Sequence, residues 1–468
     1  MNKRLLLSRY VLFDVIAAVI VWILFMVFRK TVNDAKVLGD VSIFVPNYDF
    51  YSSLFLFPLA CLFIYYLSGY YINPIKDSKF TEFFTTFLSS LVVSISIFFV
   101  LMINDIVASY VYYYYSLLVL FGLLFSITYF FRVIISANIR RNFRKKKMTI
   151  NTLIIGTGNN AKKIAGDMRK NSKYNTLIGF IQENNKENEI SKDNILGSIK
   201  EISKIIDNES IKEVIVALDE TSEEKIFNII NNLFRFDVDI QFTPRLYEIL
   251  TGSRVQINKY GINPLVSVSK PSMSDWELSV KRFFDIVLST LALIFSSPVL
   301  AYFSISIKRN SKGSIFYKQE RIGYHGKKFN IYKLRTMYTN SENGRPRLSS
   351  SDDDRITSVG RTLRKFRFDE IPQFWNIIKG DMSLVGPRPE RQYFIDKIIK
   401  EAPYYCLLYK IRPGLTSWGP IKIGYSDTIE KMIERLNYDI VYMENMSLFN
   451  DLKILLFTLE IIIRGKGV

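Results

Sequence analysis

The run Ile286-Val-Leu-Ser-Thr-Leu-Ala-Leu-Ile-Phe-Ser-Ser-Pro-Val-Leu-Ala-Tyr-Phe-Ser-Ile-Ser-Ile307 is 22 residues long and carries no charged side chain. An apolar run of this length is sufficient for a helix to cross the hydrocarbon core of a bilayer. Basic pairs border it on both sides, Lys281-Arg282 before it and Lys308-Arg309 after it. Because positive charge marks the cytoplasmic side of a membrane segment, this pattern favours two ends on the same side.

The middle of this run carries a second signal, Ser297-Pro298. Proline has no amide hydrogen to donate and interrupts the helical hydrogen-bond ladder, while serine hydroxyls are able to satisfy the backbone groups that it frees. We therefore predict a re-entrant helix over residues 283–307 that breaks at Ser297 and Pro298 and turns back. The alternative is a plain spanning helix, which places its two ends on opposite sides.

Four further apolar segments fill the N-terminal part of the chain, and each has roughly the 20 residues that a membrane span requires. They are Tyr10–Phe28, Phe50–Tyr71, Phe83–Ile103 and Tyr110–Ile135. The first has no small-residue cleavage site, which disfavours a cleaved signal peptide. We predict a four-helix transmembrane domain over residues 1–139. Both of its ends should face the cytoplasm, because a basic run, residues 140–147, follows the fourth segment.

The composition supports a membrane location. The 468 residues are 49% hydrophobic, and the net charge is +18. Much of the excess positive charge adjoins the apolar segments, where it meets anionic lipid headgroups, so it indicates a membrane surface and not nucleic acid. The two cysteines, Cys61 and Cys406, and the single histidine, His325, do not form a zinc-binding pattern. A single histidine also disfavours a Ser-His-Asp mechanism.

From residue 149 the pattern changes to that of a soluble α/β domain, which we place at residues 140–270. A buried strand is followed by the turn Gly156-x-Gly158-x-x-Ala161 and a helix, and further strands and helices alternate after it, as in a Rossmann-like parallel sheet. Gly156 and Gly158 are candidate nucleotide-binding positions, and Glu183 lies where an acid that binds a ribose is expected. This turn alone is a weak signal, so a regulatory or scaffolding role stands beside a redox role.

Beyond residue 307, the stretch Leu363–Glu390 combines carboxylates with cations. Asp369 and Glu370 are adjacent, and two prolines around Arg388 hold its backbone extended. A carboxylate serves as a phosphoryl-accepting nucleophile or as a Mg²⁺ ligand, and arginine binds phosphate with a planar fork. The stretch therefore favours phosphate chemistry, and a solvated helix of mixed charge is the ordinary alternative.

The order of these residues resembles the signature of a bacterial enzyme family. Asp369-Glu-Ile-Pro-Gln373 followed by Gly380-Asp-Met-Ser-Leu-Val-Gly-Pro-Arg-Pro-Glu390 is similar to the bacterial sugar transferases of the polyprenol-phosphate hexose-1-phosphate transferase superfamily. The resemblance extends from Lys281 to the C-terminus. Further motifs that carry it are Lys281-Arg-Phe-Phe-Asp285, Gln319–Phe329, Tyr332-Lys-Leu-Arg-Thr-Met337, Val359-Gly-Arg361, Arg412-Pro-Gly-Leu-Thr-Ser-Trp418 and Tyr442–Leu448.

The resemblance implies a membrane protein of α plus α/β class, with a mainly helical catalytic domain at residues 271–468. It implies that Asp369 is a nucleophile that forms a phosphosugar-aspartyl intermediate, and that Glu370 binds Mg²⁺. The phosphate contacts that we assign in the same way are Lys333, Arg335, Arg388 and Arg412.

The same resemblance implies the substrates and the location. The donor is expected to be a UDP-sugar, with galactose or glucose favoured, and the acceptor undecaprenyl phosphate in the lipid bilayer. The catalytic domain is expected to face the cytoplasm at the bacterial inner membrane, and the chain to form a homo-oligomer, a dimer. Transfer would initiate capsule, exopolysaccharide or O-antigen synthesis.

Two other classes of function remain open at this point. One is a membrane-anchored NAD-dependent nucleotide-sugar oxidoreductase or dehydratase built on the Rossmann-like domain, which turnover of NAD would reveal. The other is a non-enzymatic scaffold for polysaccharide assembly, which would release no UMP from any UDP-sugar.

Overall fold

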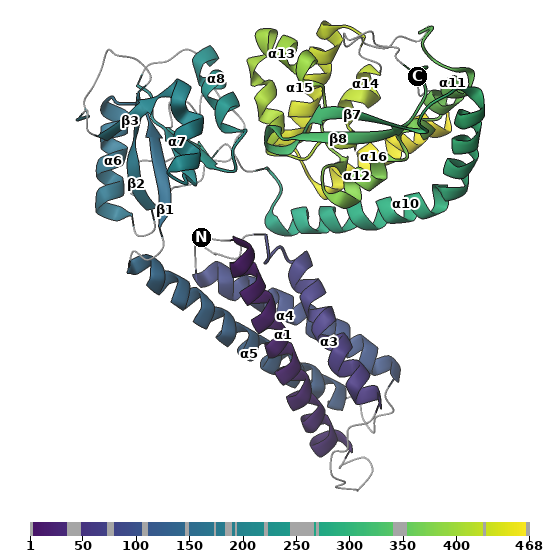
Figure 1. Ribbon diagram of the computed structural model, residues 1–468. Coiled ribbons are helices and arrows are strands. Elements are labelled where there is room, and N and C mark those ends of the chain that lie inside the picture. Colours follow the sequence, from purple (N-terminus) through teal and green to yellow (C-terminus); the bar gives the residue numbers. More distant parts are fainter. Residues whose placement is uncertain are drawn as a thin grey trace. The chain divides into compact units, whose positions relative to one another are not determined.

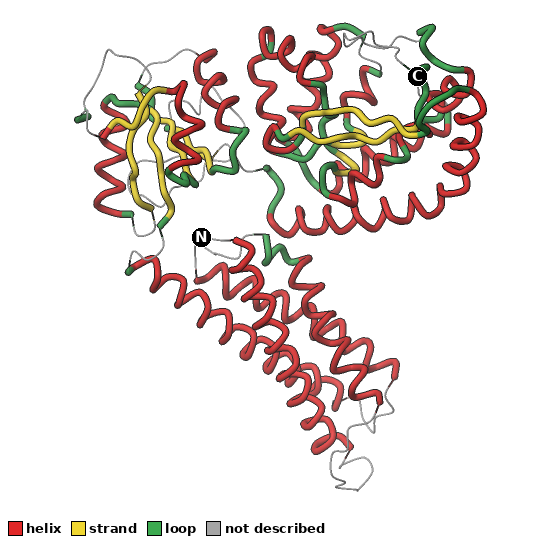
Figure 2. The backbone as a smooth tube through the Cα atoms, viewed as in Figure 1, coloured by secondary structure: helices red, strands yellow, loops and turns green. Residues whose placement is uncertain are grey.

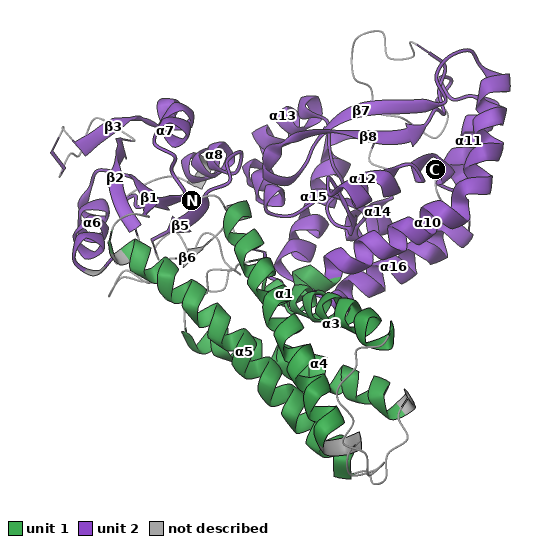
Figure 3. Ribbon diagram, turned by 60° about the horizontal axis from the view of Figure 1, so that its bottom comes forward, with its two compact units in different colours: residues 1–148, 274–280 green, residues 149–273, 281–468 purple. Residues whose placement is uncertain are grey.

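The computed structural model describes residues 3–34, 48–72, 79–104, 111–145, 149–172, 175–182, 190–191, 194–219, 223–243, 266–267, 271–339, 353–424 and 427–464. The chain divides into two compact units, residues 1–148 with 274–280 and residues 149–273 with 281–468 (Figure 3). Among the described residues, five helices are long and apolar enough to cross a membrane by length and composition. The chain is therefore a membrane protein that also contains a parallel α/β sheet.

The first unit consists of apolar helices. They are α1 (Lys3–Phe28), continued by the π-helical turn η1 (Arg29–Asp34), α3 (Tyr48–Leu67), α4 (Lys79–Asn104) and α5 (Val111–Arg144). Helix α1 packs against α3 and α5, and α4 packs against α5 (Figure 1). Outward-facing side chains are apolar as well, and Phe55, Leu118 and Phe130 are more than 60% exposed. Such a surface suits contact with lipid.

A buried ion pair ties this unit together. The Asp14 carboxylate of α1 lies 2.9 Å from the Arg132 guanidinium of α5, and both side chains are 1% exposed. Tyr71 donates a hydrogen bond of 2.8 Å to Asp14, and Arg132 donates one of 3.1 Å to Thr86. The aromatic ring of Tyr70 lies 3.7 Å from the guanidinium carbon. A buried charge is tolerated only with such partners, so this pair joins α1 to α5.

The second unit begins with the sheet that the sequence predicts. Its strands are β1 (Ile150–Ile155), β2 (Asn175–Gln182), β3 (Ile195–Ser198), β4 (Glu213–Val216), β5 (Asp239–Phe242) and β6 (Val266–Ser267). The order is β3-β2-β1-β4-β5-β6, and only β6 is antiparallel to its neighbour. Figure 2 shows strands in yellow and helices in red. The helices α6 (Asn159–Asn171), α7 (Ile202–Asn208) and α8 (Glu223–Leu233) accompany it. The predicted Rossmann-like parallel sheet is confirmed.

The C-terminal part of this unit is mainly helical. Its elements are α10 (Asp275–Asn310), the antiparallel hairpin β7 (Phe316–Ile322) and β8 (Lys328–Leu334) with the turn η4 (Tyr324–Gly326), α11 (Ser358–Lys365), η5 (Phe368–Glu370), α12 (Gln373–Lys379), β9 (Ser383–Val385), α13 (Gln392–Glu401), η6 (Pro403–Lys410), β10 (Gly414–Thr416), α14 (Trp418–Ile423), α15 (Ile429–Glu444) and α16 (Leu448–Ile463). Strands β9 and β10 pair in parallel. Helix α8 of the sheet region packs on η6, and one apolar cluster contains both Ile230 and Tyr405.

Both ends of α10 are held by this C-terminal part. Near its beginning, Lys281 binds the Asp451 carboxylate and donates to the Val385 carbonyl at 2.9 Å, and Arg282 donates to the Ile377 carbonyl at 2.7 Å. Near its end, Ile307 is buried against Leu334 and Leu363. Between these anchors every residue is described, and the only buried ones are Asp285 and Ser289; large apolar side chains such as Phe295, 77% exposed, and Tyr302, 67% exposed, point outward.

The predicted break at Ser297 and Pro298 is wrong in one respect, because α10 continues through both residues as one helix. Figure 1 shows that the helix changes direction toward its C-terminal end. Proline leaves the carbonyl four residues earlier, that of Ile294, without its usual donor. The Ser297 hydroxyl donates to this carbonyl at 2.8 Å, so the hydrogen bond is replaced and the helix persists.

Candidate active site

The adjacent carboxylates lie on the single turn η5. Arg367, which precedes this turn, has a φ of 54°, in the left-handed region that a residue with a side chain rarely adopts. This reversal ends α11 and turns Asp369 and Glu370 into the protein, where they are 7% and 8% exposed. Strained backbone persists only where its surroundings hold it, and such positions are concentrated at functional sites.

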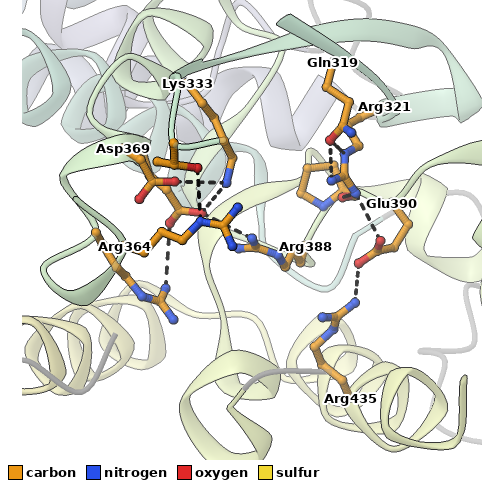
Figure 4. A network of polar contacts seen from close by, with 12 residues as sticks. Gln319, Arg321, Lys333, Arg364, Asp369, Arg388, Glu390 and Arg435 are labelled. Atoms are coloured by element: carbon orange, nitrogen blue, oxygen red, sulfur yellow. Dashed lines mark hydrogen bonds and ion pairs between the residues drawn. The ribbon is translucent and has the colours of Figure 1, made fainter. Parts of the chain in front are cut away.

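Cations from two distant segments meet these carboxylates. Lys333, on β8, lies 2.9 Å from Glu370 Oε1 and 3.6 Å from Asp369 Oδ2. Arg388 lies 3.2 Å from the same Glu370 oxygen, and Figure 4 shows both cations directed at the carboxylate pair. The other Glu370 oxygen, Oε2, lies 3.8 Å from the Arg367 guanidinium, beyond hydrogen-bond distance.

The two carboxyl groups differ in their ionisation. Burial raises the pKa of Asp369 above its ordinary value, although Lys333 opposes this and Glu370 adds to it. Burial also acts to raise the pKa of Glu370, but Lys333, Arg388 and Arg367 together outweigh it and hold that pKa well below the usual range. Glu370 is therefore a fixed anion bound to cations. Asp369 is an equally buried carboxyl group whose pKa stays raised, and a more basic carboxylate suits a nucleophile.

A second layer of charges supports Arg388. The Glu390 carboxylate, two residues further on, lies 3.1 Å from Arg321 and also binds Arg435 of α15 (Figure 4). Asp439 lies one helical turn after Arg435 and is 2% exposed. Burial raises its pKa to about 6, against the opposing effects of Arg435, the Ser417 hydroxyl and the backbone amide of Arg388. These groups therefore fix the backbone of the loop that carries Arg388.

The structure thus brings together four of the predicted site residues, Asp369, Glu370, Lys333 and Arg388. Arg335 lies elsewhere, because its guanidinium donates to the backbone carbonyls of Ser311 and Lys312 after the end of α10, both at 2.8 Å.

Arg412 is also placed apart from the pair. It donates to the Gly380 carbonyl at 3.1 Å, and its guanidinium carbon lies 5.6 Å from the centre of the Tyr324 ring. Within the described part of the chain, neither Arg335 nor Arg412 forms an ion pair with Asp369 or Glu370.

The supporting residues Glu390, Arg435 and Asp439 were absent from the sequence-based prediction. Glu390 belongs to the motif that carried the family resemblance, so its position in the motif was a usable signal. Arg435 and Asp439 are four residues apart, the spacing that places two side chains on one face of a helix. That spacing alone does not show which loop the face supports.

The predicted nucleotide-binding turn lies at the carboxyl end of β1. Gly156 has a φ of 121°, and a Cβ there would overlap the Ala217 carbonyl, so the position requires glycine. Gly158 precedes α6, and the Asp219 carboxylate lies directly against it. Glu183 lies outside the described residues.

Two protein families match the chain. The family described as "Bacterial sugar transferase" matches residues 276–465, and the family described as "CoA-binding domain" matches residues 67–244. The first match contains the site of Figure 4, and the second contains the Gly156 turn.

Three relatives show the range of similarity. The UDP-N-acetylgalactosamine-undecaprenyl-phosphate N-acetylgalactosaminephosphotransferase of Aeromonas hydrophila is 35% identical over 230 residues, 49% of this chain and 53% of the relative. The UDP-glucose:undecaprenyl-phosphate glucose-1-phosphate transferase of Escherichia coli K12 is 36% identical over 197 residues, 42% of each chain. An uncharacterized sugar transferase of Bacillus subtilis is 37% identical over 190 residues, 40% of this chain and 90% of the relative. The matched stretch thus spans about half the length of the first two relatives.

Proposed function

Since the chain belongs to the bacterial sugar transferase family, we propose that it transfers a sugar-1-phosphate from a UDP-sugar to undecaprenyl phosphate. The observation that carries this proposal is the buried pair Asp369 and Glu370, which Lys333 and Arg388 surround. A site with two carboxylates and a convergent set of cations is suited to a transferring phosphoryl group, whose negative charge the cations stabilise. The named relatives act on undecaprenyl phosphate, which supports the same acceptor here.

In the first step of the proposed reaction, an Asp369 oxygen attacks the β-phosphorus of the UDP-sugar. The bond from this phosphorus to the bridging oxygen breaks, UMP leaves, and a phosphosugar-aspartyl acyl phosphate remains. In the second step, a phosphate oxygen of undecaprenyl phosphate attacks the same phosphorus and releases the Asp369 carboxylate. Lys333 and Arg388 bind the phosphate oxygens in both steps, and Glu370 holds these two cations in place.

The described residues supply too few ligands to hold a Mg²⁺ ion by themselves, so the phosphates of the substrate must supply others. Among the described residues, no three His, Cys, Asp or Glu side chains gather into a metal site. Glu370 Oε2 is outside hydrogen-bond distance of Arg367 and offers one hard oxygen ligand. Mg²⁺ is commonly bound by one or two carboxylates together with substrate phosphates and water. We propose that Glu370 holds the ion, which would neutralise charge on the diphosphate.

We further propose that α10 is re-entrant and enters the membrane from the cytoplasmic side. Its two ends are bound to the same folded part of the chain, through Lys281 and Arg282 at one end and Ile307 at the other. The ends of a helix that spans a bilayer lie about 30 Å apart on opposite sides, which one domain at the surface does not bridge. The site therefore lies at the interface, where a soluble sugar nucleotide and a lipid-bound phosphate meet.

We also propose that the helices of the first unit form a four-helix transmembrane domain with both ends in the cytoplasm. Their outward apolar surfaces support the membrane location, and the basic run after α5 supports the orientation. The donor sugar is proposed to be glucose or galactose. The sugars in the names of the relatives differ, so the identity of the donor is a question for assay.

The test measures release of UMP by the full chain in detergent, with UDP-glucose, UDP-galactose, UDP-N-acetylglucosamine and UDP-N-acetylgalactosamine in turn. With undecaprenyl phosphate present, the wild type should release UMP continuously. Without it, the wild type should release about one UMP per site, because the aspartyl acyl phosphate accumulates. Asp369→Asn should lose at least roughly a thousandfold in rate, or about 4 kcal/mol, whereas Asp427→Asn, an exposed control, should not. Turnover without a stoichiometric burst would exclude the covalent route, and no release from any donor would exclude the function.

A further inference from the structure

The sheet region of the second unit matches a family of CoA-binding domains and carries a glycine turn of dinucleotide-binding type. Cofactors bind such a turn through a pyrophosphate at the N-terminus of the following helix, here α6. Free backbone N–H groups and the positive end of the helix dipole stabilise its charge there. Whether this chain binds a cofactor in that way depends on what occupies the N-terminus of α6.

The Asp219 side chain occupies this position. It comes from the loop after β4, and its Oδ1 accepts a hydrogen bond of 3.0 Å from the backbone N–H of Asn160, in the first turn of α6. The other oxygen, Oδ2, lies against Gly158, where a Cβ would overlap it. The Asn160 side-chain amide donates to the Leu218 carbonyl at 3.3 Å, which fixes the two loops to each other.

The Asp219 carboxylate gives the N-terminus of α6 the hydrogen-bond acceptor and the negative charge that a bound phosphate gives in a dinucleotide-binding domain. A carboxylate at a helix N-terminus satisfies a free N–H group and stabilises the dipole. A pyrophosphate brought to the same N–H would meet an anion of the same sign, and it would have to displace Asp219 from the glycine. The absence of a side chain at Gly158 therefore makes room for a carboxylate of the protein itself.

We propose that the glycine turn of this domain is closed by the Asp219 carboxylate and binds neither a dinucleotide nor CoA. The role of Gly158 is then to allow the contact between the loop after β4, which carries Asp219, and the N-terminus of α6. The domain still packs on the catalytic part through α8 and η6, so its contribution is structural contact with the transferase and not cofactor chemistry.

Hydrogen exchange of the full chain in detergent, followed by mass spectrometry of peptides covering residues 156–165, tests this assignment. Asp219→Ala removes the cap, so these amides should exchange roughly two- to thirty-fold faster. Asp219→Asn keeps an oxygen acceptor and should restore protection. Asp207→Ala, which removes an exposed aspartate of α7 in the same domain, is the matched control and should leave the peptide unchanged.

The same peptides report on cofactors. In the wild type, millimolar NAD⁺ or CoA should leave the exchange of residues 156–165 unchanged. Protection of this segment by either compound would overturn the proposal, because it would show that the turn accepts a pyrophosphate. Exchange in Asp219→Ala equal to that of the wild type would also overturn it, because Asp219 would then not cap α6. Both measurements are independent of transferase activity.

Discussion

Removal of Lys333 is the sharpest test of how the carboxylate pair works. Its ammonium lies 2.9 Å from Glu370 and 3.6 Å from Asp369, and its side chain is 19% exposed. At an effective dielectric constant of about 20, these distances correspond to about 6 and about 5 kcal/mol of attraction. A neighbouring opposite charge lowers the pKa of a carboxyl group by about one to three units. Lys333→Met should therefore raise the pKa of Asp369 further above its ordinary value.

The sign of the effect on the rate follows from the role of Asp369. The nucleophile acts as a carboxylate, and burial already raises its pKa, so activity increases as pH rises through that pKa. The acid limb of kcat for UMP release should move to higher pH in Lys333→Met, and part of the lost rate should return toward pH 9. Lys328→Met, on the same strand but 64% exposed in a surface ion pair, should show the wild-type profile. An acid limb in Lys333→Met that coincides with that of the wild type would refute the coupling.

Three further predictions concern stability, topology and the role of Arg335. Because burial raises the pKa of Asp439 to about 6, ionisation disfavours the folded state. Stability should fall by up to roughly 3 kcal/mol as pH rises from about 4 to 6, and Asp439→Asn, unlike Asp207→Asn, should flatten this slope in urea titrations. Trp276→Cys and Lys308→Cys, each in a background without Cys61 and Cys406, should react with an impermeant thiol reagent from the same side of sealed vesicles; labelling from opposite sides would mean that α10 spans. Arg335→Met should lower the thermal unfolding temperature and leave KM for the UDP-sugar unchanged, whereas a rise in KM alone would restore the predicted phosphate contact.

Local sequence signals predicted the main helices, strands and the carboxylate pair. The features that the sequence did not predict depend on contacts between residues that are not close neighbours in the pattern. The adjacency of Asp369 and Glu370 and the alternation of strands and helices are visible within a few residues, so both could be predicted. Arg335 occurs in the same motif as Lys333, two residues away, a spacing that places two side chains on one face of a strand. Strand β8 ends at Leu334, however, and the Arg335 guanidinium donates to the backbone carbonyls of Ser311 and Lys312, a contact that the spacing does not reveal. Asp219 is 59 residues from the amide that it caps, and no periodicity connects them. At Pro298 the prediction of a break failed because the Ser297 hydroxyl supplied a replacement donor.

The anchoring of α10 also has a consequence for the way in which the chain is made. The helix precedes in sequence most of the residues that hold its ends, from Leu334 and Leu363 to Asp451. At about 5–20 residues per second, the roughly 140 residues between Asn310 and Asp451 take about 7 to 28 seconds to synthesise. During that interval the insertion machinery meets the apolar run without the domain that later fixes it. The basic pairs at both ends and Pro298 are then the signals available to direct it, so their loss should produce misinserted chains even where the finished fold would tolerate the change.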